Sequence, residues 1–463
     1  MKYKKVVVLL AVATLGIAGC GKGNDTAGTY VLSGTLSDGQ IVVDSEDKDS
    51  VRLVLNGAEI TCSNSSAIWV KDGDTIITLA DGTENTLTDG AEYTTDSEDD
   101  EPKAAVYAKD DLTFNGSGSL TVNGNYKNGI QCKDALKFVS GTYKITAANN
   151  GLVGKDSVSI KDGTYTITSG GDGIKSTNTD ETDQGYVIID GGTFTITAEG
   201  DGIQADKTLN ISGGTIDIQQ CYEGIEGFNI VIDDGDIRVT SSDDAINAAG
   251  KSEDTETTSS TGEEKPSADS SADTTAESGK NKEQTNGSRP DPGNGPGGGQ
   301  QPGQMSGGME AEDQGATLTI NGGSLYVNAN GDGLDANGDI LITGGNLTLH
   351  GPEDGGNGTL DYASECKITG GTFAAVGSNG MIQNPSEDSE QPVICQSLDS
   401  QVESGTVISV KDEEGNVITE IKTEKNVQWY AFSSSKFKVG KTYTICIGDQ
   451  ETEVTLESNY TEL

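Results

Sequence analysis

Apolar and polar residues alternate in short runs along most of this chain, and the same runs recur at a fixed interval. A period of two within a run is the pattern of a β-strand that buries one face. Each repeat holds three such runs, as in 129–132, 136–138 and 143–145. The glycines that open successive copies stand 22 residues apart, at Gly129, Gly151 and Gly173.

A fixed repeat of this length predicts stacked supersecondary units rather than a compact globule. One coil of three strands cannot bury its apolar face alone, whereas coils stacked about 4.8 Å apart enclose a continuous core. The pattern therefore predicts an all-β fold, a parallel β-helix with about 22 residues per coil. Parallel crossovers favour right-handed winding. Cys132 shares the inward parity of the apolar positions, which predicts a buried free thiol.

Changes in the apolar–polar pattern and in composition divide the chain into segments. We predict a β-helix over 28–391, interrupted at 251–315 by a Ser/Thr/Glu-rich and then Gly/Pro/Gln-rich insert with no alternation. Such a composition cannot bury enough apolar surface to fold. The insert lies between two predicted strands of the same coil, so the coil continues on either side of it. Residues 392–463 have longer alternating runs with hairpin turns, which predicts a small C-terminal antiparallel β unit.

The first twenty residues resemble a bacterial lipoprotein leader. Three lysines precede a short apolar run, and Ile17-Ala18-Gly19-Cys20 resembles a lipobox. By that resemblance Cys20 is lipidated and becomes the mature N-terminus, followed by a short tether at 21–27. An ordinary secretory leader is the alternative. Either interpretation predicts an extracytoplasmic protein, whose contact with the membrane is through the lipid anchor alone.

The charged residues of the chain limit the classes of molecule that it can bind. The 463 residues include 74 acids against 30 bases, a net charge of −44. Such a charge repels nucleic acid and anionic lipid surfaces, so neither is an expected partner. An acidic polymer would need bridging cations. We expect a monomer.

Acidic residues recur just before the opening glycines, where stacking would bring them into one file. Clusters of carboxylate oxygens suit a hard cation such as Ca²⁺. The alternative is that these residues serve turn geometry and stacked side-chain hydrogen bonds. The candidate ligands in and near the file are Asp172, Asp180, Asp183, Asp201, Asp206, Glu223, Glu226, Asp243, Asp244, Asp332 and Asp335.

A second column lies two residues after each opening glycine and faces outward. Aromatic rings followed by amides and charges on a flat sheet are suited to a linear polysaccharide. The alternative is that the aromatic pair packs under the acidic loop that precedes residue 104. The candidate carbohydrate-binding residues are Trp69, Tyr107, Gln131, Lys175 and Gln204 in this column, and Tyr326 on a third strand.

Catalytic signals are weak. His350 is the single histidine, in an expected loop, and no nucleophile motif accompanies the serines and threonines. We therefore assign no catalytic residue. A pectate-lyase-like eliminase using Lys155 or Lys175 as base remains the enzyme alternative, and a non-catalytic adhesin or envelope spacer is the structural one.

Several strings of this sequence resemble a known family. GTYVLSGTLSDGQIVV, VRLVLNGAEIT, DDLTFNGSGSLTVNGNYKNGI and GGDGIKSTN are similar to the clostridial carbohydrate-binding-domain-containing β-helix proteins, which are related in fold to pectate lyases. The resemblance covers roughly residues 28–384. It implies a right-handed parallel β-helix, bound Ca²⁺ and binding to cellulose and acidic sugars such as polygalacturonate, without established enzymatic activity. The expected protein is a lipid-anchored surface protein that binds plant-wall polysaccharide with the help of Ca²⁺.

Overall fold

A computed structural model describes residues 28–45, 50–94, 102–179, 182–250 and 315–463, together with the backbone of two strands in the first twenty residues. The chain divides into two units, of which the first comprises Met1–Ser252 and Ala311–Leu463. The second, Glu253–Glu310, and with it most of the predicted insert, lies outside the described residues, as does the predicted tether. All regular elements in the described ranges are strands.

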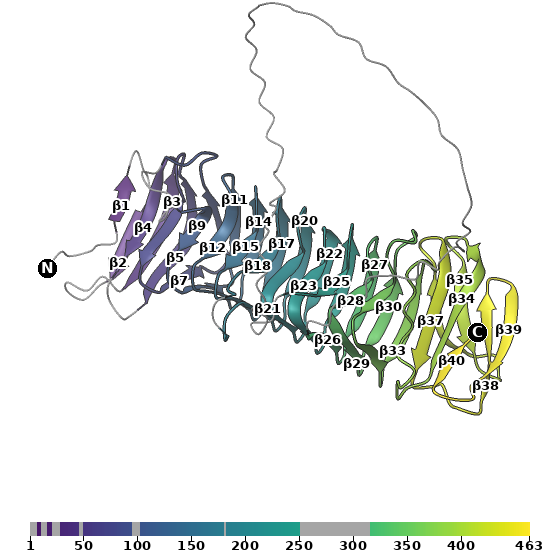
Figure 1. The fold of residues 1–463 in the computed structure, drawn as a ribbon. Coiled ribbons are helices and arrows are strands. Elements are labelled where there is room, and N and C mark those ends of the chain that lie inside the picture. Colours follow the sequence, from purple (N-terminus) through teal and green to yellow (C-terminus); the bar gives the residue numbers. More distant parts are fainter. Residues whose placement is uncertain are drawn as a thin grey trace, which may run out of the picture. The chain divides into compact units, whose positions relative to one another are not determined.

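The first unit is a stack of coils whose strands pair in parallel with the coil before and after (Figure 1). Three rows of strands result, as predicted. The first row comprises β4 (Gly39–Asp44), β6 (Ile68–Asp72), β9 (Ala104–Ala108), β12 (Asn128–Cys132), β15 (Leu152–Gly154), β18 (Ile174–Ser176), the start of β21 (Ile203–Ile211) and of β23 (Ile225–Ile232), β25 (Ile246–Ala248), β28 (Leu334–Ala336) and β31 (Leu360–Tyr362).

The second row begins with the long strands β3 (Thr29–Leu36) and β5 (Val51–Thr61). β5 serves two rows, because its first residues pair with β7 (Thr75–Leu79) and its last residues pair with β8 (Glu84–Thr88) of the third row. The row continues with β7 (Thr75–Leu79), β10 (Leu112–Gly116), β13 (Ala135–Phe138), β16 (Ser157–Ile160), β19 (Tyr186–Ile189), the ends of β21 and β23, β26 (Ala316–Ile320), β29 (Gly338–Ile342) and β32 (Glu365–Ile368).

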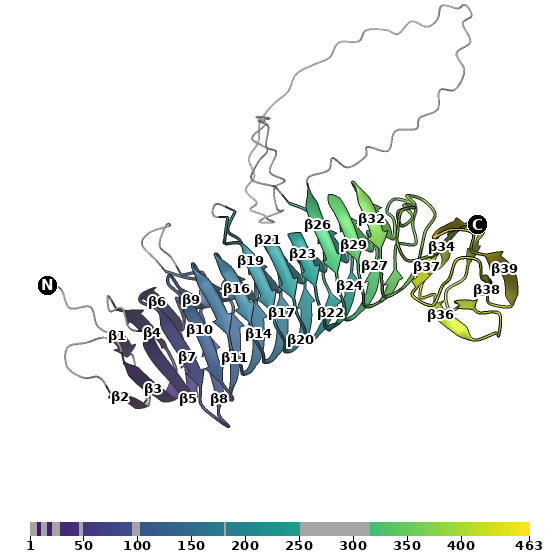
Figure 2. The ribbon, with the colours of Figure 1, turned by 90° about the horizontal axis from the view of Figure 1, so that it is seen from below.

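The third row lies side by side on the face turned to the viewer in Figure 2. It comprises β8 (Glu84–Thr88), β11 (Ser119–Gly124), β14 (Thr142–Ala147), β17 (Thr164–Ser169), β20 (Thr193–Ala198), β22 (Thr215–Gln220), β24 (Asp236–Ser241), β27 (Ser324–Ala329), β30 (Asn346–His350) and β33 (Thr372–Gly377).

The core is a thin column of inward-facing side chains from the three rows. In the first row Ile130, Leu152, Ile174 and Ile203 succeed one another, each fully buried. In the third row aromatic rings stack behind the sheet: the ring centroids of Tyr165 and Phe194 lie 4.7 Å apart with planes 6° from parallel. Cys132 is buried and free, as predicted. This repetition of like side chains at strand spacing holds the coils in register.

Insertions leave the register intact. Equivalent residues are 22 apart at Asn128 and Asn150, 29 apart where a short loop intervenes, and 88 apart across 251–314. One further coil departs from the 22-residue spacing. Gly358 is the register partner of Asp332, at a separation of 26 residues, because the loop before it is longer.

The chain ends in two further groups of strands. β37 (Val427–Ser434) pairs antiparallel with β33, and with β34 (Val393–Val402) and β40 (Tyr460–Glu462) extends the main sheet. β36 (Val417–Lys422), β35 (Val407–Lys411), β38 (Thr442–Ile447) and β39 (Gln450–Thr455) form a separate antiparallel sheet. Hairpins join β35 to β36 and β38 to β39 at the glycine turns Gly415 and Gly448.

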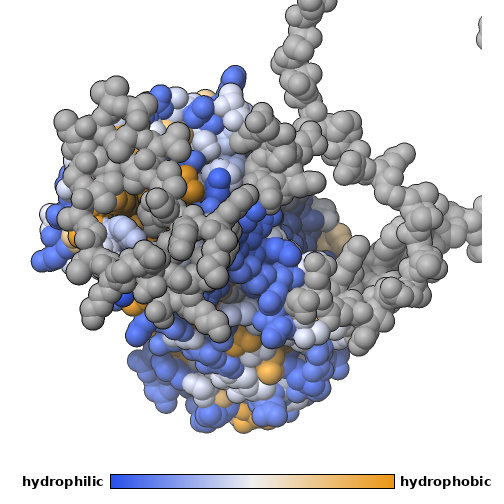
Figure 3. Space-filling view, turned by 90° about the vertical axis from the view of Figure 1, so that its left-hand side faces the viewer, coloured by the Kyte–Doolittle hydropathy of each residue, from blue (hydrophilic) through white to orange (hydrophobic). Residues whose placement is uncertain are grey.

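At the other end, two strands fall within the predicted leader. β1 (Val7–Leu10) pairs antiparallel with β4, and β2 (Gly16–Cys20) with β3. Within the described residues there is no helix apolar and long enough to span a bilayer. Viewed from the N-terminal side, the described surface is mostly hydrophilic, with small separate hydrophobic patches (Figure 3).

Candidate functional site

The predicted file of residues before the opening glycines exists, and hydrogen bonds connect it from coil to coil. The Oδ1 atom of Asn150 accepts the backbone N–H of Asp172 at 2.8 Å, and Oδ1 of Asp172 accepts that of Asp201 at 3.0 Å. The pattern continues at Glu223 and, beyond the insert, at Asp332. The alternative role, stacked side-chain hydrogen bonds, is therefore present in the structure. A carboxylate that accepts one backbone N–H keeps its second oxygen for another partner.

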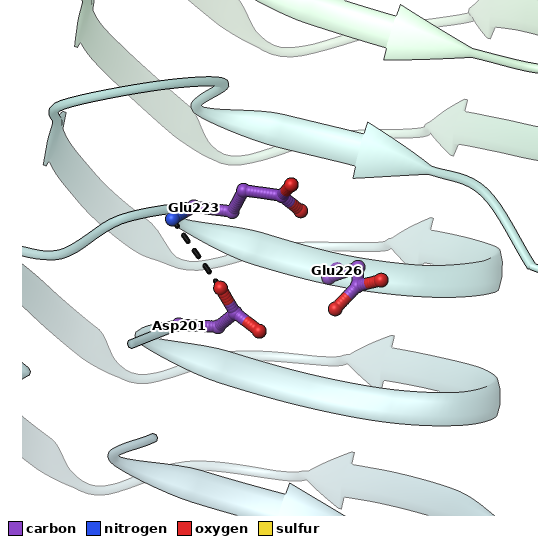
Figure 4. Close-up of side chains that lie close together, drawn as sticks. All are labelled: Asp201, Glu223 and Glu226. Carbon is purple, nitrogen blue, oxygen red and sulfur yellow. Dashed lines mark hydrogen bonds between the residues drawn. The ribbon is translucent and has the colours of Figure 1, made fainter. Parts of the chain in front are cut away.

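Two acidic triads form where the file meets the outward column. The first is Asp201, Glu223 and Glu226 (Figure 4). The second is Asp244, Asp332 and Asp335. Within each triad, one carboxylate oxygen of every residue lies within 4.8 Å of the others. Ligand oxygens that surround one Ca²⁺ at 2.3–2.6 Å are separated by at most about 5 Å, so the spacing fits a shared ion.

Burial and mutual repulsion disfavour the charged form of these carboxylates. Burial, together with Asp201, raises the pKa of Glu223 to about 7, and burial, Glu223 and Asp201 raise the pKa of Glu226 to about 8. In the second triad burial and neighbouring carboxylates raise the pKa of Asp332 to about 7 and of Asp335 to about 8. Each triad is thus a place where negative charge is costly unless protons or a cation offset it.

Neutral oxygens adjoin the triads. Oε1 of Gln204 and Oδ1 of Asn247 are buried and have no hydrogen-bond partner among the described residues. The two residues flank Glu226 in the outward column, and the amide nitrogen of Asn247 donates to Glu223 at 3.0 Å. A buried acceptor without a partner costs free energy, and a hard cation is one partner that would satisfy it. The donor set of carboxylate and amide oxygens fits Ca²⁺.

The other predicted metal ligands do not join either triad. Asp172 is ion-paired with Lys175, whose Nζ lies 2.7 Å from Oδ2 of the aspartate. Asp206 lies at the corner of the β21 strand, Asp183 is exposed in the short insertion, and Asp180 lies outside the described residues. Asp243 accepts the Tyr222 hydroxyl, which raises the pKa of that tyrosine to about 12. Because Lys175 is held in this ion pair with Asp172, it is not a free base.

The residues of the predicted outward column do align from coil to coil, but their aromatic rings do not form an exposed platform. Trp69, Tyr107 and Gln131 are neighbours in successive coils, as predicted. Tyr107, however, is only 2% exposed, so its predicted exposure is wrong. Neighbours at strand spacing lie on both sides of it in the column. Trp69 is half-buried beneath the ammonium of Lys71, 3.8 Å from the ring centroid. The tip of the acidic loop thought to cover the pair lies outside the described residues.

The remaining carbohydrate candidates are also engaged. Gln131 accepts a hydrogen bond from Asn128 at 2.9 Å. The guanidinium of Arg238 stacks 3.7 Å from the centroid of Tyr326, and His350, in strand β30 rather than the expected loop, packs beside that ring with centroids 5.5 Å apart. A ring whose face is covered by an arginine offers little stacking area to a sugar.

One acidic residue at this site was missed. Asp361 is the register partner of Asp335, and its carboxylate contributes to the raised pKa of both Asp332 and Asp335. It stands directly after the apolar residue of its coil, like the other members of the column. The longer loop before Gly358 displaced it from the repeat and hid this signal.

The protein is thus an all-β solenoid with two acidic triads. The family model for carbohydrate-binding domain-containing proteins matches residues 25–288, more than half of the chain, and the chain belongs to that family. The matched residues include the first triad and end before Asp332 and Asp335.

Two further similarities cover smaller parts. A carbohydrate-binding domain-containing protein from Acetivibrio thermocellus is 43% identical over 122 residues. The match spans 26% of this chain and 43% of that relative, less than half its length. A solved structure of a polysaccharide lyase-like protein from C. thermocellum, a gadolinium derivative, has 34% sequence identity and a TM-score of 0.40, and the alignment covers 51% of this chain and 90% of that chain.

Proposed function

We propose that this protein binds polysaccharide and that Ca²⁺ held by the two triads takes part, either by bracing the coils or by bridging to uronate groups of an acidic glycan. The observation that carries the proposal is the pair of triads with unpartnered amide oxygens beside them. Membership of a carbohydrate-binding family supports the polysaccharide as partner. With a net charge of −44, direct contact with an acidic glycan is repulsive, and a bridging cation removes that repulsion.

The geometry favours binding over catalysis. The ammonium of Lys175, one of the two lysines offered as a base, is held against Asp172 at 2.7 Å. A general base must be free to reach the proton that it abstracts, and this amine is held by the aspartate. The ion pair argues against Lys175 as a base, and we place the activity in recognition of cellulose or polygalacturonate-type chains.

Affinity electrophoresis tests this function. Migration should be retarded in gels that contain polygalacturonate and Ca²⁺, and EDTA should restore free migration. The variant Asp332→Asn/Asp335→Asn removes two ligands of one triad and is expected to lose at least tenfold in affinity. Asp183→Asn/Asp190→Asn makes the same change in net charge at exposed positions outside the triads and serves as the control. Unretarded migration on every polysaccharide, with or without Ca²⁺, would refute the proposal.

We further propose that the protein works at the outer surface of the cell membrane, anchored through Cys20. The basic residues, apolar run and lipobox-like sequence at the start of the chain support this. Cleavage before Cys20 removes all of β1 and all of β2 except Cys20, and these strands pair with β4 and β3. Cells fed radiolabelled palmitate should label the wild-type protein and not Cys20→Ser. Equal labelling of the two would contradict the anchor.

A further inference from the structure

The outer face of the third row carries a regular array of threonines. The strands β14, β17 and β20, side by side in Figure 2, read TYKITA, TYTITS and TFTITA, so alternate positions are threonine except for Lys144. The register aligns them across coils. The threonine array comprises Thr142, Thr146, Thr164, Thr166, Thr168, Thr193, Thr195 and Thr197.

The array is a two-dimensional lattice of outward-facing hydroxyl and methyl groups, half-buried at Thr195 and Thr197 and exposed at the other positions. Neighbours lie about 4.8 Å apart across strands and about 6.6 Å apart along a strand. Thr164, Thr166 and Thr168 are exposed, and the residues between them, Tyr165 and Ile167, are each 1% exposed and face the core. In the part of the chain that the structure describes, none of the eight array hydroxyls has a side-chain hydrogen-bond partner.

The lattice is held rigid from behind. The rings of Tyr143 and Tyr165 stack with centroids 5.0 Å apart and planes 11° from parallel, and Phe194 continues the stack. The hydroxyl of Tyr143 donates to the carbonyl of Ser140 at 2.6 Å, which anchors the ring at the turn. β-Branched threonines have few χ1 rotamers, so their hydroxyls lose little freedom when they bind. Such preorganisation favours binding to a partner with a matching repeat.

The strands of the threonine array carry little charge. The chain has 74 acidic residues, yet β14, β17 and β20 have none, and Lys144 is their one charged residue. The register partner of Thr195 on the next strand, β22, is Asp217, so the uncharged area ends there. A ligand placed on the array displaces water from hydroxyl and methyl groups without desolvating carboxylates, a step that would cost much more. The face also has none of the large exposed apolar anchors typical of protein–protein interfaces.

We propose that the threonine array is a second glycan-binding surface, which takes the flat face of an uncharged, extended polysaccharide such as cellulose and needs no Ca²⁺. The inference rests on the proposed function and adds to it a separate site. Threonine hydroxyls donate to and accept from sugar hydroxyls, while their methyl groups contact the C–H faces of the rings. The strand spacing is close to the length of one sugar ring, so one chain lying across the strands meets a threonine at each ring.

Depletion of protein from solution by crystalline cellulose, measured in EDTA, tests this surface. The variant Thr164→Val/Thr166→Val/Thr168→Val removes three hydroxyls and keeps shape and strand propensity, so its circular dichroism and melting should match wild type. Its affinity for cellulose should fall at least tenfold. The control Thr113→Val/Thr208→Val/Thr319→Val makes the same change on outward positions of the second row and should bind like wild type.

The outcomes separate this inference from the proposed function. Wild-type binding to cellulose that the array variant retains in full overturns the array and leaves polysaccharide binding intact. Binding to polygalacturonate with Ca²⁺ but not to cellulose also overturns the array alone. Cellulose binding that EDTA abolishes assigns it to the acidic triads and overturns the array. A wild-type protein that binds no polysaccharide overturns both.

Discussion

Ca²⁺ is expected to raise the melting temperature of EDTA-treated protein by several degrees, and Asp332→Asn/Asp335→Asn should remove the part of that rise that the second triad contributes. A ligand that binds only the folded state stabilises it by about 2.7 kcal/mol at one hundred times its dissociation constant. The triads exist only when successive coils are stacked, so the unfolded chain has no equivalent site. Thermal unfolding followed by circular dichroism, with and without Ca²⁺, measures the effect.

The pH dependence provides an internal control. In EDTA, stability should fall as the pH rises from about 4 to about 8. Carboxylates have an unfolded pKa near 4, whereas burial and mutual repulsion raise the pKa of Glu226 and Asp335 to about 8 in the folded chain. The folded state therefore binds protons more tightly, and this stabilisation is lost as the pH rises through the folded pKa values. Ca²⁺ should flatten the decline, because the ion replaces the protons. Stability that rises over this range in EDTA contradicts the account.

Gly173→Ala is expected to destabilise the first unit by about 3 kcal/mol, toward the upper end of the cost of overpacking. A Cβ at this opening glycine would lie 2.5 Å from the carbonyl oxygen of Gly202 and 2.7 Å from Cγ2 of Ile196. That oxygen accepts the backbone N–H of Ile174 at 3.1 Å, so it cannot retreat without weakening a bond between coils. The opening glycines thus permit close approach of successive coils.

Gly356→Ala is the matched control. Its added Cβ would have its nearest neighbour at 3.4 Å, the Oδ1 of an exposed aspartate, and its backbone is not left-handed. Urea unfolding of the two variants should separate them clearly, with Gly173→Ala less stable. Equal midpoints for the two would show that coil packing tolerates a side chain at the opening position.

The regular repeat explains why the row and the face of most residues could be predicted from the sequence. A pattern that recurs in parallel strands assigns every position to a row and a face, because neighbours in register must share parity. The succession Gln204, Glu226, Asn247 and Asp335 in one outward column followed from this, and the register bears it out across the insert. The two files that meet at the triads were therefore visible in the sequence as columns.

Side-chain contacts were not predictable to the same degree. Parity says that Tyr107 and Lys175 face outward, but not that Tyr107 is buried or that Lys175 turns to Asp172. These outcomes depend on side-chain reach and neighbours, which a repeat does not encode. Asp361 was missed because loop length shifted its coil out of the repeat.

The threonine array shows a different limitation. Its signal, threonine at alternate positions of TYTITS and TFTITA, is present in the sequence. Threonine is also a common strand residue, so the pattern alone reads as strand propensity. The register that aligns Thr166 with Thr195 turns single outward threonines into a regular array across strands, which the sequence of one strand does not reveal.

X-ray diffraction from crystals grown in Ca²⁺, collected at a wavelength where calcium scatters anomalously, tests the central claim most directly. One anomalous peak is expected at Asp201, Glu223 and Glu226 and another at Asp244, Asp332 and Asp335, each about 2.3–2.6 Å from carboxylate oxygens. Peaks that lie away from both triads, or none at millimolar Ca²⁺, would contradict it.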